Sequence, residues 1–296
     1  MNGNKSQTFL LILTASFFML LIYTLKFSPR INQGSETTIM LTGDVMLGRT
    51  VMTKSLDLSN PSYPFEKVSD ELNEADIVFV NLENPMVSNC HRSYESLIFC
   101  ADPAMVEGLV TAGIDIVNLA NNHSRNYGES GLAETIEILD EKEILTTGLG
   151  ELVVKESKGI KYGFLGFDFI SKIPKENDYK LVAESVGKAD VLVVSVHWGA
   201  EYRKEPAEIQ KQWAKKLVEA GADVVVGHGP HWVQGMEYIN EKPVYYSLGN
   251  FVFDQMWSEE TRKSLVIKLT YRDGKLVKEE ELSTYMSSWA QPEFIR

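Results

Sequence analysis

Four of the five histidines in this sequence stand in short polar segments that follow apolar runs. Two of them, His228 and His231, are three positions apart in GADVVVGHGPHWVQG, residues 221–235. With the carboxylates and the amide of similar segments, the candidate set comprises Asp44, Glu83, Asn122, His123, His197, His228 and His231. Neutral imidazoles combined with carboxylate and amide oxygens favour Mn, Fe or Zn over Ca or Mg alone. The residue types therefore predict a divalent metal site.

Such a site forms only if the fold brings these distant segments together. Four of the segments place an Asp before an apolar, β-branched run, and they span residues 74–84, 113–123, 188–198 and 221–231. Runs without polar alternation are typical of strands that are buried on both faces. A fifth strand is predicted over residues 37–49, TTIMLTGDVMLGR, and it carries Asp44.

Helical patterns lie between these strands, over residues 102–113, 129–142 and 206–221. The first begins with Asp then Pro and ends with Gly, as capping chemistry prefers. Strands that alternate with helices predict an α/β fold with a parallel or mixed sheet. Ligands in such sheets bind at the carboxyl ends of the strands, which is where the candidate residues stand.

Taken singly, each candidate has an ordinary structural explanation. Asp44 would cap a turn, Glu83 would pair with a basic side chain, and His197 would be a hydrogen-bonded core histidine. Four histidines placed after buried strands are hard to assign to chance, so the hypothesis rests on the whole set.

The N-terminus predicts a membrane anchor. Residues 8–25 carry no charge and are flanked by Lys5, Lys26 and Arg30. About 18 apolar residues suffice to cross a bilayer as a helix. The alternative, a cleaved signal peptide, has a shorter apolar region and a small-residue cleavage site, which the sequence lacks. We expect a cytoplasmic tip and transmembrane helix over 1–27, a linker over 28–37 and one domain over 38–296, with that domain outside the cytoplasm.

Charge and motifs exclude several classes of function. The net charge of −12 and the lack of a basic run disfavour nucleic-acid binding. No Gly-rich phosphate loop is present, so ATP-dependent ligation is not expected of this chain. Cys90 and Cys100 would close a small loop as a disulfide outside the cytoplasm, or remain two free thiols.

Six motifs carry a resemblance to a known family. In chain order they are TGDVMLGR, NLENP, LANNHSRNYGESG, SVHWGAEY, GHGPHWVQ and YSLGNFVFDQ. Together they resemble the CapA family of poly-γ-glutamate capsule biosynthesis proteins, also called PgsA, over roughly residues 38–270. That family is similar to the calcineurin-like metallophosphoesterases, which implies a four-layer α-β-β-α sandwich. Its members typically carry an N-terminal membrane segment.

The resemblance also implies a role for each candidate residue. Asp44 and His231 would bind one metal ion, Glu83 would bridge two ions, and Asn122, His197 and His228 would bind the second. His123 would protonate a leaving group. Arg49 offers a bidentate grip for phosphate or carboxylate, or would simply pair with an acidic neighbour.

The sequence departs from the related patterns at three places. Met46 stands where the phosphoesterases have a histidine ligand, so the first metal site has fewer ligands. Gly229 and Asn126 replace residues common in the CapA pattern, and both changes bear on the surroundings of the ligands. Asn250 and Asp254 are further candidates for supporting contacts at the same rim.

The resemblance implies a membrane-anchored component of capsule synthesis or export that works with the membrane subunits of poly-γ-glutamate synthase. The alternative is an extracytoplasmic metal-dependent phosphatase or phosphodiesterase that acts independently of a capsule, and a third is a scaffold with a vestigial site. Poly-γ-glutamate is a polyanion and the protein is acidic, so we expect any polymer binding to depend on metal.

Overall fold

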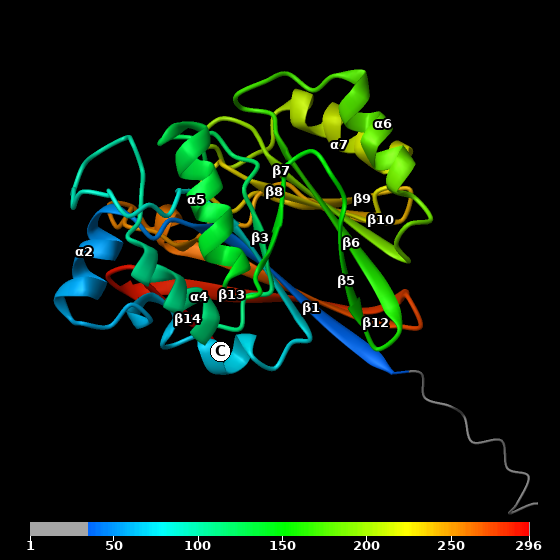
Figure 1. Cartoon of the computed structure of the whole chain (residues 1–296). Coiled ribbons are helices and arrows are strands. Elements are labelled where there is room, and N and C mark those ends of the chain that lie inside the picture. The colour runs from blue at the N-terminus through cyan, green and yellow to red at the C-terminus, as the bar shows by residue number, and fades with distance from the viewer. Residues whose placement is uncertain (1–34, 296) are drawn as a thin grey trace, which may run out of the picture. The chain divides into compact units, whose positions relative to one another are not determined.

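The computed structural model describes residues 35–295 (Figure 1). The predicted transmembrane helix over 1–27 and most of the predicted linker lie outside the described residues. Within residues 35–295, no helix has both the length and the apolar character needed to cross a membrane.

Two β-sheets form the centre of the domain. The first has eight strands in the order β14-β13-β12-β1-β2-β3-β4, and β11 pairs with β1. Its strands are β1 (Glu36–Val45), β2 (Ile77–Leu82), β3 (Ile116–Asn118), β4 (Leu145–Thr147), β11 (Asn250–Val252), β12 (Lys263–Arg272), β13 (Lys275–Ser288) and β14 (Gln291–Phe294). Strands β1 to β4 run parallel, whereas β12 to β14 are antiparallel to their neighbours.

The second sheet has six strands in the order β5-β6-β7-β8-β10-β9. They are β5 (Val153–Ser157), β6 (Ile160–Asp168), β7 (Val191–His197), β8 (Val224–His228), β9 (Met236–Ile239) and β10 (Lys242–Tyr245). Its central pairs are parallel and its two edge pairs are antiparallel. The mixed sheets predicted from alternating strands and helices are therefore confirmed.

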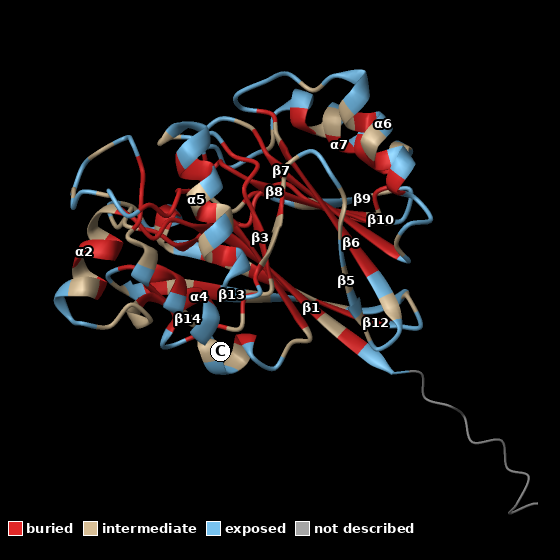
Figure 2. Ribbon diagram, in the orientation of Figure 1, coloured by how far each residue is buried: buried red, intermediate tan, exposed pale blue. Residues whose placement is uncertain are grey.

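Helices cover the outer face of each sheet. The α-helices are α2 (Arg49–Asp57), α3 (Ser69–Leu72), α4 (Val106–Thr111), α5 (Gly128–Asp140), α6 (Glu176–Ser185) and α7 (Glu208–Ala220). Single 3-10 turns occur at η1 (Tyr63–Phe65), η2 (Pro103–Met105) and η3 (Glu260–Arg262). Figure 2 shows buried residues concentrated in the strands and exposed residues on the outer sides of α5, α6 and α7.

Three apolar layers separate these elements. One layer joins the first sheet to α2, α4 and α5, a second lies between the two sheets, and a third joins the second sheet to α6 and α7. In the middle layer, Phe79 of β2 stacks on Phe164 of β6 with ring centroids 5.8 Å apart. The order helix, sheet, sheet, helix is the predicted four-layer sandwich.

Alternation along the strands decides which residues reach the middle layer. In β2, Val78 and Val80 face the helices, while Ile77 and Phe79 face the other sheet. Because side chains alternate along a strand, the next residues on the inner side are Asn81 and Glu83. The polar candidate residues therefore continue the inter-sheet layer beyond its apolar part.

Two predicted elements differ in detail from those observed. The strand predicted over 37–49 ends at Val45, and α2 begins at Arg49 after a turn. Arg49 adopts a left-handed conformation, with φ 45°. Gly48 precedes it because a β-carbon there would lie 2.2 Å from the Cys100 carbonyl oxygen. Because of this turn, Arg49 begins a helix and does not continue the strand that carries Asp44.

The helix predicted from Asp102 is divided into η2 and α4. Asp102 does cap the first turn, since its side chain accepts a hydrogen bond from the Ala104 N–H at 2.9 Å. Nearby, Cys90 and Cys100 form a disulfide with a Cα–Cα separation of 5.7 Å. The disulfide closes the segment between them into a loop.

Candidate metal centre

Five candidate ligands meet between the sheets at the carboxyl ends of four strands. Asp44 lies in β1, Glu83 follows β2, His197 ends β7, His228 ends β8, and His231 follows three residues later. All five are buried. His197 and His228 are register partners across β7 and β8, which sets the two rings side by side.

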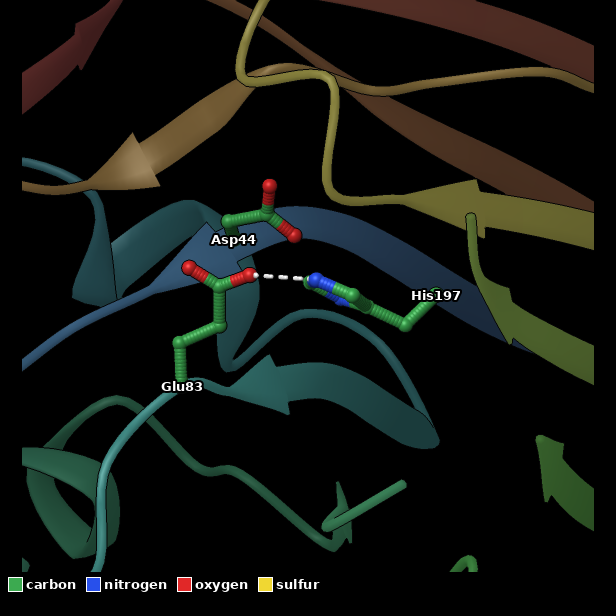
Figure 3. A group of neighbouring side chains, drawn as sticks. All are labelled: Asp44, Glu83 and His197. Atoms are coloured by element: carbon green, nitrogen blue, oxygen red, sulfur yellow. Dashed lines mark ion pairs between the residues drawn. The ribbon is translucent and has the colours of Figure 1, made fainter. Parts of the chain in front are cut away.

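The distances between these side chains are short. His197 Nε2 lies 3.2 Å from Glu83 Oε1, the pair joined by the dashed line in Figure 3. Asp44, Glu83 and His197 each offer a ligand atom within 4.8 Å of the others. Asp44 also contacts His228 Nδ1 at 3.1 Å and His231 Nδ1 at 3.3 Å, and His231 Nδ1 lies 4.0 Å from Glu83 Oε2.

Several ligand atoms lack the partners that buried polar atoms normally have. Within residues 35–295, neither oxygen of the wholly buried Glu83 accepts a hydrogen bond, although His197 Nε2 lies near one of them, and His228 Nε2 is also unpartnered. Leaving such atoms unsatisfied is costly, so buried polar groups of this kind are typical of a site that binds a ligand. Carboxylate oxygens beside bare imidazole nitrogens fit a divalent cation.

The pKa values of the two carboxyl groups also favour a bound cation. Burial, with the neighbouring charge of Asp44, holds the pKa of Glu83 well above its ordinary value. Burial also acts to raise the pKa of Asp44, but hydrogen bonds from His228 and His231 outweigh it and hold this pKa far below the ordinary value. A cation between the two groups would relieve the repulsion that Asp44 exerts on Glu83.

The histidines differ in charge although they are neighbours. Burial lowers the pKa of His197 to about 3, so this ring is neutral at pH 7. Burial acts to lower the pKa of His231 as well, but the charges of Glu83 and Asp44 raise it to about 9. His231 must therefore lose a proton before it binds a metal ion at neutral pH.

An amide that the sequence analysis missed organises the centre. Asn81 Nδ2 donates to Asp44 Oδ1 at 3.0 Å and lies 3.3 Å from His197 Nδ1. Its Oδ1 accepts from Asn118 Nδ2 at 2.8 Å and from Asn121 Nδ2 at 3.3 Å. The signal was present in the sequence, because Asn81 is an amide inside an apolar run, two residues before Glu83 and on the same face.

The turn after β8 holds two further contacts. The backbone N–H of Gly229 donates to Asp44 Oδ2 at 3.2 Å, and a β-carbon at Gly229 would lie 2.9 Å from His197 Nε2. His231 takes a left-handed conformation, with φ 60°, and its Nδ1 donates to Asn250 Oδ1 at 2.9 Å. Asn250 thus makes the supporting contact expected of it.

Asn122 and His123 do not join the cluster of buried ligands. Asn121 is turned inward to Asn81, while Asn122 is exposed and lines a cavity. His123 lines the same cavity, and its ring stacks on Phe99 with centroids 3.9 Å apart. Burial, together with the charge of His231, lowers the pKa of His123 to about 4.

Arg49 lies at the cavity wall and forms an ion pair with Asp254. Its guanidinium carbon lies 4.4 Å from the centre of the Phe99 ring. Burial raises the pKa of Asp254, and Arg49 opposes this shift. Asp254, one of the predicted rim residues, is therefore the acidic partner of Arg49, and Phe99 contacts both Arg49 and His123.

Met46 is not directed to the centre. Its side chain is buried in the layer beneath the helices, and its sulfur accepts from the Gly48 N–H at 3.1 Å. Met46 therefore contributes no ligand beside Asp44.

A cavity of about 750 Å³ opens beside these residues. His231, Arg49 and His123 line it, so a molecule in the cavity reaches the edge of the metal centre. The arrangement suits binding of an anion to metal, with an arginine and a histidine beside it.

The chain is similar in sequence to two curated capsule biosynthesis proteins. It is 31% identical over 276 residues to the capsule biosynthesis protein CapA of Bacillus anthracis, covering 82% of this chain and 66% of that protein. It is 29% identical over 265 residues to the PGA biosynthesis protein CapA of Bacillus subtilis (strain 168), covering 81% and 70%. The chain thus spans about two thirds of the length of these relatives.

A solved structure supports the fold. The putative 5'-nucleotidase from Staphylococcus aureus, in complex with alpha-ketoglutarate, matches with a TM-score of 0.50 and 15% identity, over 88% of this chain and 54% of that one. At this identity the likeness concerns the sandwich alone. Residues 38–255 match the family described as bacterial capsule synthesis protein PGA_cap, and the chain therefore belongs to this CapA family of capsule synthesis proteins.

Proposed function

We propose that this protein is a membrane-anchored accessory component of poly-γ-glutamate capsule synthesis or export, whose domain binds divalent metal outside the cytoplasm. The observation that carries the proposal is the match to the capsule synthesis family over the residues that build the metal centre, 38–255. Its partners would be the membrane subunits of the poly-γ-glutamate synthase, and its ligand a polyanionic polymer or a phosphoester.

The proposed anchor and location rest on two observations. Residues 8–25 form an uncharged apolar segment of sufficient length to cross a bilayer. Cys90 and Cys100 are bridged, and disulfides persist mainly in oxidising compartments outside the cytoplasm. Both favour a single-pass membrane protein with an extracytoplasmic domain.

The metal ligands would be Glu83, His197 and His228, with Asp44 and His231 beside them. When bound, divalent Mn, Fe or Zn polarises phosphoryl or carboxylate oxygens and activates water. Arg49, held by Asp254, would orient an anion at the cavity wall. His123 is neutral at pH 7 in the ligand-free protein, and an anion bound beside it would raise its pKa and prepare it to donate a proton.

Metal analysis of the purified full chain in detergent tests the centre. Wild type would be compared with Glu83→Gln and His228→Ala, and His91→Ala serves as control because His91 is exposed and outside the cluster. We expect metal in wild type and in the control, and loss from both centre variants. Absence of metal after soaking in Mn and Zn would contradict the proposal.

The capsule role is tested in a poly-γ-glutamate-producing Bacillus strain that lacks its own CapA. The full chain and the same variants would be expressed there and the secreted polymer measured. We expect polymer with wild type and His91→Ala, and a strong reduction with His228→Ala. Equal polymer from every variant would mean that the metal centre does not serve synthesis or export.

A second function is favoured by the cavity beside the centre. Arg49 and His123 line it together with His231, an arrangement suited to phosphoester hydrolysis without a capsule partner. Turnover of bis(p-nitrophenyl) phosphate by the Mn-loaded protein, lost in His123→Ala, would support it. Absence of turnover with Mn, Fe and Zn would exclude it.

A further inference from the structure

The outer part of the cavity is lined by aromatic side chains. We call Tyr94, Tyr202, Trp257 and Trp289 the aromatic mouth, since all four line the cavity beside the metal centre. Tyr94 is 65% exposed, Trp257 62% and Trp289 37%. Large rings exposed at a concave surface are features of a ligand site.

Tyr202 joins the aromatic mouth to the metal centre. Its ring centroid lies 5.9 Å from that of His231 and 5.0 Å from that of Trp257. The rings of Tyr202 and Trp257 are nearly perpendicular, at 77°. A ligand that reaches Trp257 therefore has its other end within reach of the histidine at the centre.

The position of Tyr202 is fixed rather than free. Its backbone is left-handed, with φ 58°, and its N–H donates to the Pro230 carbonyl at 2.8 Å. Its hydroxyl accepts from Gln255 Nε2 at 3.0 Å. Such a conformation persists in a non-glycine residue where its surroundings hold it, and functional sites are a common place for it.

The charge of the aromatic mouth selects its ligand. Glu95 and Glu201 line the cavity, and neither forms an ion pair within residues 35–295. The arginine of the cavity, Arg49, is already paired with Asp254. The outer part of the cavity thus combines exposed rings with two carboxylates that form no ion pair in the described part of the chain, while the protonated His231 lies further in, beside Asp44.

We infer that the aromatic mouth binds an organic ammonium group. A cation over the faces of Trp and Tyr is attracted by the ring electrons, and nearby carboxylates add to that attraction. A neutral flat ring would use the same aromatic surfaces but gain nothing from Glu95 and Glu201. This inference deepens the proposed function and rests on it: a ligand whose anionic group reaches the metal centre carries an ammonium group on a short linker.

The test compares ligands of one shape that differ in charge. Choline and its uncharged carbon analogue, 3,3-dimethylbutan-1-ol, would be titrated into the full chain in a maltoside detergent with EDTA present. Binding would be followed by broadening of the ligand's methyl signal in NMR spectra, with protein-free micelles as reference. We expect choline to bind about tenfold more tightly than the neutral analogue.

Ethanolamine distinguishes a primary ammonium ligand from a quaternary one. Tighter binding of ethanolamine than of choline would assign a primary ammonium held by the carboxylates, and the reverse would assign a quaternary group held by the rings. If neither cation exceeds the neutral analogue, the inference fails.

Variants separate this site from general surface binding. Trp257→Leu should weaken choline binding about tenfold, and Glu201→Gln should weaken choline but not the neutral analogue. Tyr238→Leu is the matched control, because Tyr238 is exposed on β9 and does not line the cavity. Circular dichroism would verify folding of each variant. Choline binding unchanged in folded Trp257→Leu would overturn the inference.

These binding measurements need neither metal nor turnover, so they fail separately from the proposed function. Where the Mn-loaded protein does hydrolyse phosphodiesters, kcat/KM for p-nitrophenylphosphorylcholine should fall about tenfold in Glu201→Gln while that for bis(p-nitrophenyl) phosphate changes little. An equal fall for both substrates would overturn the role of Glu201 in selecting the ammonium group.

Discussion

Replacing Glu83 by glutamine should stabilise the metal-free protein and abolish its stabilisation by metal. Glu83 is wholly buried, and neither of its carboxylate oxygens accepts a hydrogen bond from the part of the chain that the structure describes. Leaving a buried polar group unsatisfied costs about 1–3 kcal/mol. Glutamine has nearly the same shape but carries no charge, so it avoids both the burial of a charge and the repulsion by Asp44. We therefore expect Glu83→Gln to raise the free energy of unfolding by about 1–3 kcal/mol in EDTA at pH 7.

The size of the stabilisation by Glu83→Gln depends on pH. Burial and the charge of Asp44 hold the pKa of Glu83 in the folded protein well above its ordinary value of about 4.5. The folded state thus holds this proton more tightly than the unfolded state, so wild type loses stability as pH rises from about 4.5 toward the folded pKa. The gain from Glu83→Gln should be near zero at pH 4 and grow above that pH.

Thermal unfolding followed by circular dichroism measures both effects. In a domain of this size each kcal/mol shifts Tm by about 2–4 °C. At a metal concentration about 1,000-fold above Kd, wild type should gain about 4.1 kcal/mol and the variant nothing, which reverses their order. Glu151→Gln is the control, because Glu151 is exposed and outside the centre. A metal-free Glu83→Gln protein less stable than wild type at pH 7 would refute the reasoning.

Three other changes test the surroundings of the centre. Phe99→Leu removes the ring stacked 3.9 Å from His123. If the Mn-loaded protein hydrolyses bis(p-nitrophenyl) phosphate, kcat for this substrate should fall about tenfold to 100-fold with little change in KM, and an unchanged kcat would show that the stacking does not position His123. Cys90→Ser with Cys100→Ser opens a loop with a sequence separation of 10, and urea unfolding should show a loss of about 2–3 kcal/mol. Gly229→Ala places a β-carbon 2.9 Å from His197 Nε2, at a backbone φ of 102° that favours glycine. Tm should fall by the equivalent of about 1–2 kcal/mol, and bound metal should decrease. A metal content equal to that of wild type would contradict this prediction.

The strand ends were predictable because they follow from short-range patterns. An apolar run that ends in a polar residue marks both a buried strand and its terminus, so the sequence alone predicts His197 and His228 at one edge of a sheet. Parallel strands then bring their carboxyl ends together. The same alternation could have identified Asn81 from its spacing to Glu83.

Contacts made by irregular segments were not predictable in this way. The sequence gives two adjacent amides, Asn121 and Asn122, after the short strand β3, and no periodicity shows which one turns inward. The contact of Phe99 with Arg49 depends on a left-handed turn and on a disulfide-closed loop, which link residues far apart in the chain. Such geometry follows from tertiary packing, which local propensity does not specify.

The two carboxyl groups of the centre are unequal as ligands, and the reason lies in their hydrogen bonds. Asp44 accepts from Asn81 on one oxygen and from Gly229 on the other, and both its oxygens also lie against histidine nitrogens. Both oxygens of Glu83 are without a hydrogen-bond partner among the described residues. An ion beside Glu83 therefore displaces no hydrogen bond, whereas an ion beside Asp44 competes with several. Since Met46 adds no ligand there, we infer that the first metal ion binds at Glu83 and that a second would bind more weakly at Asp44.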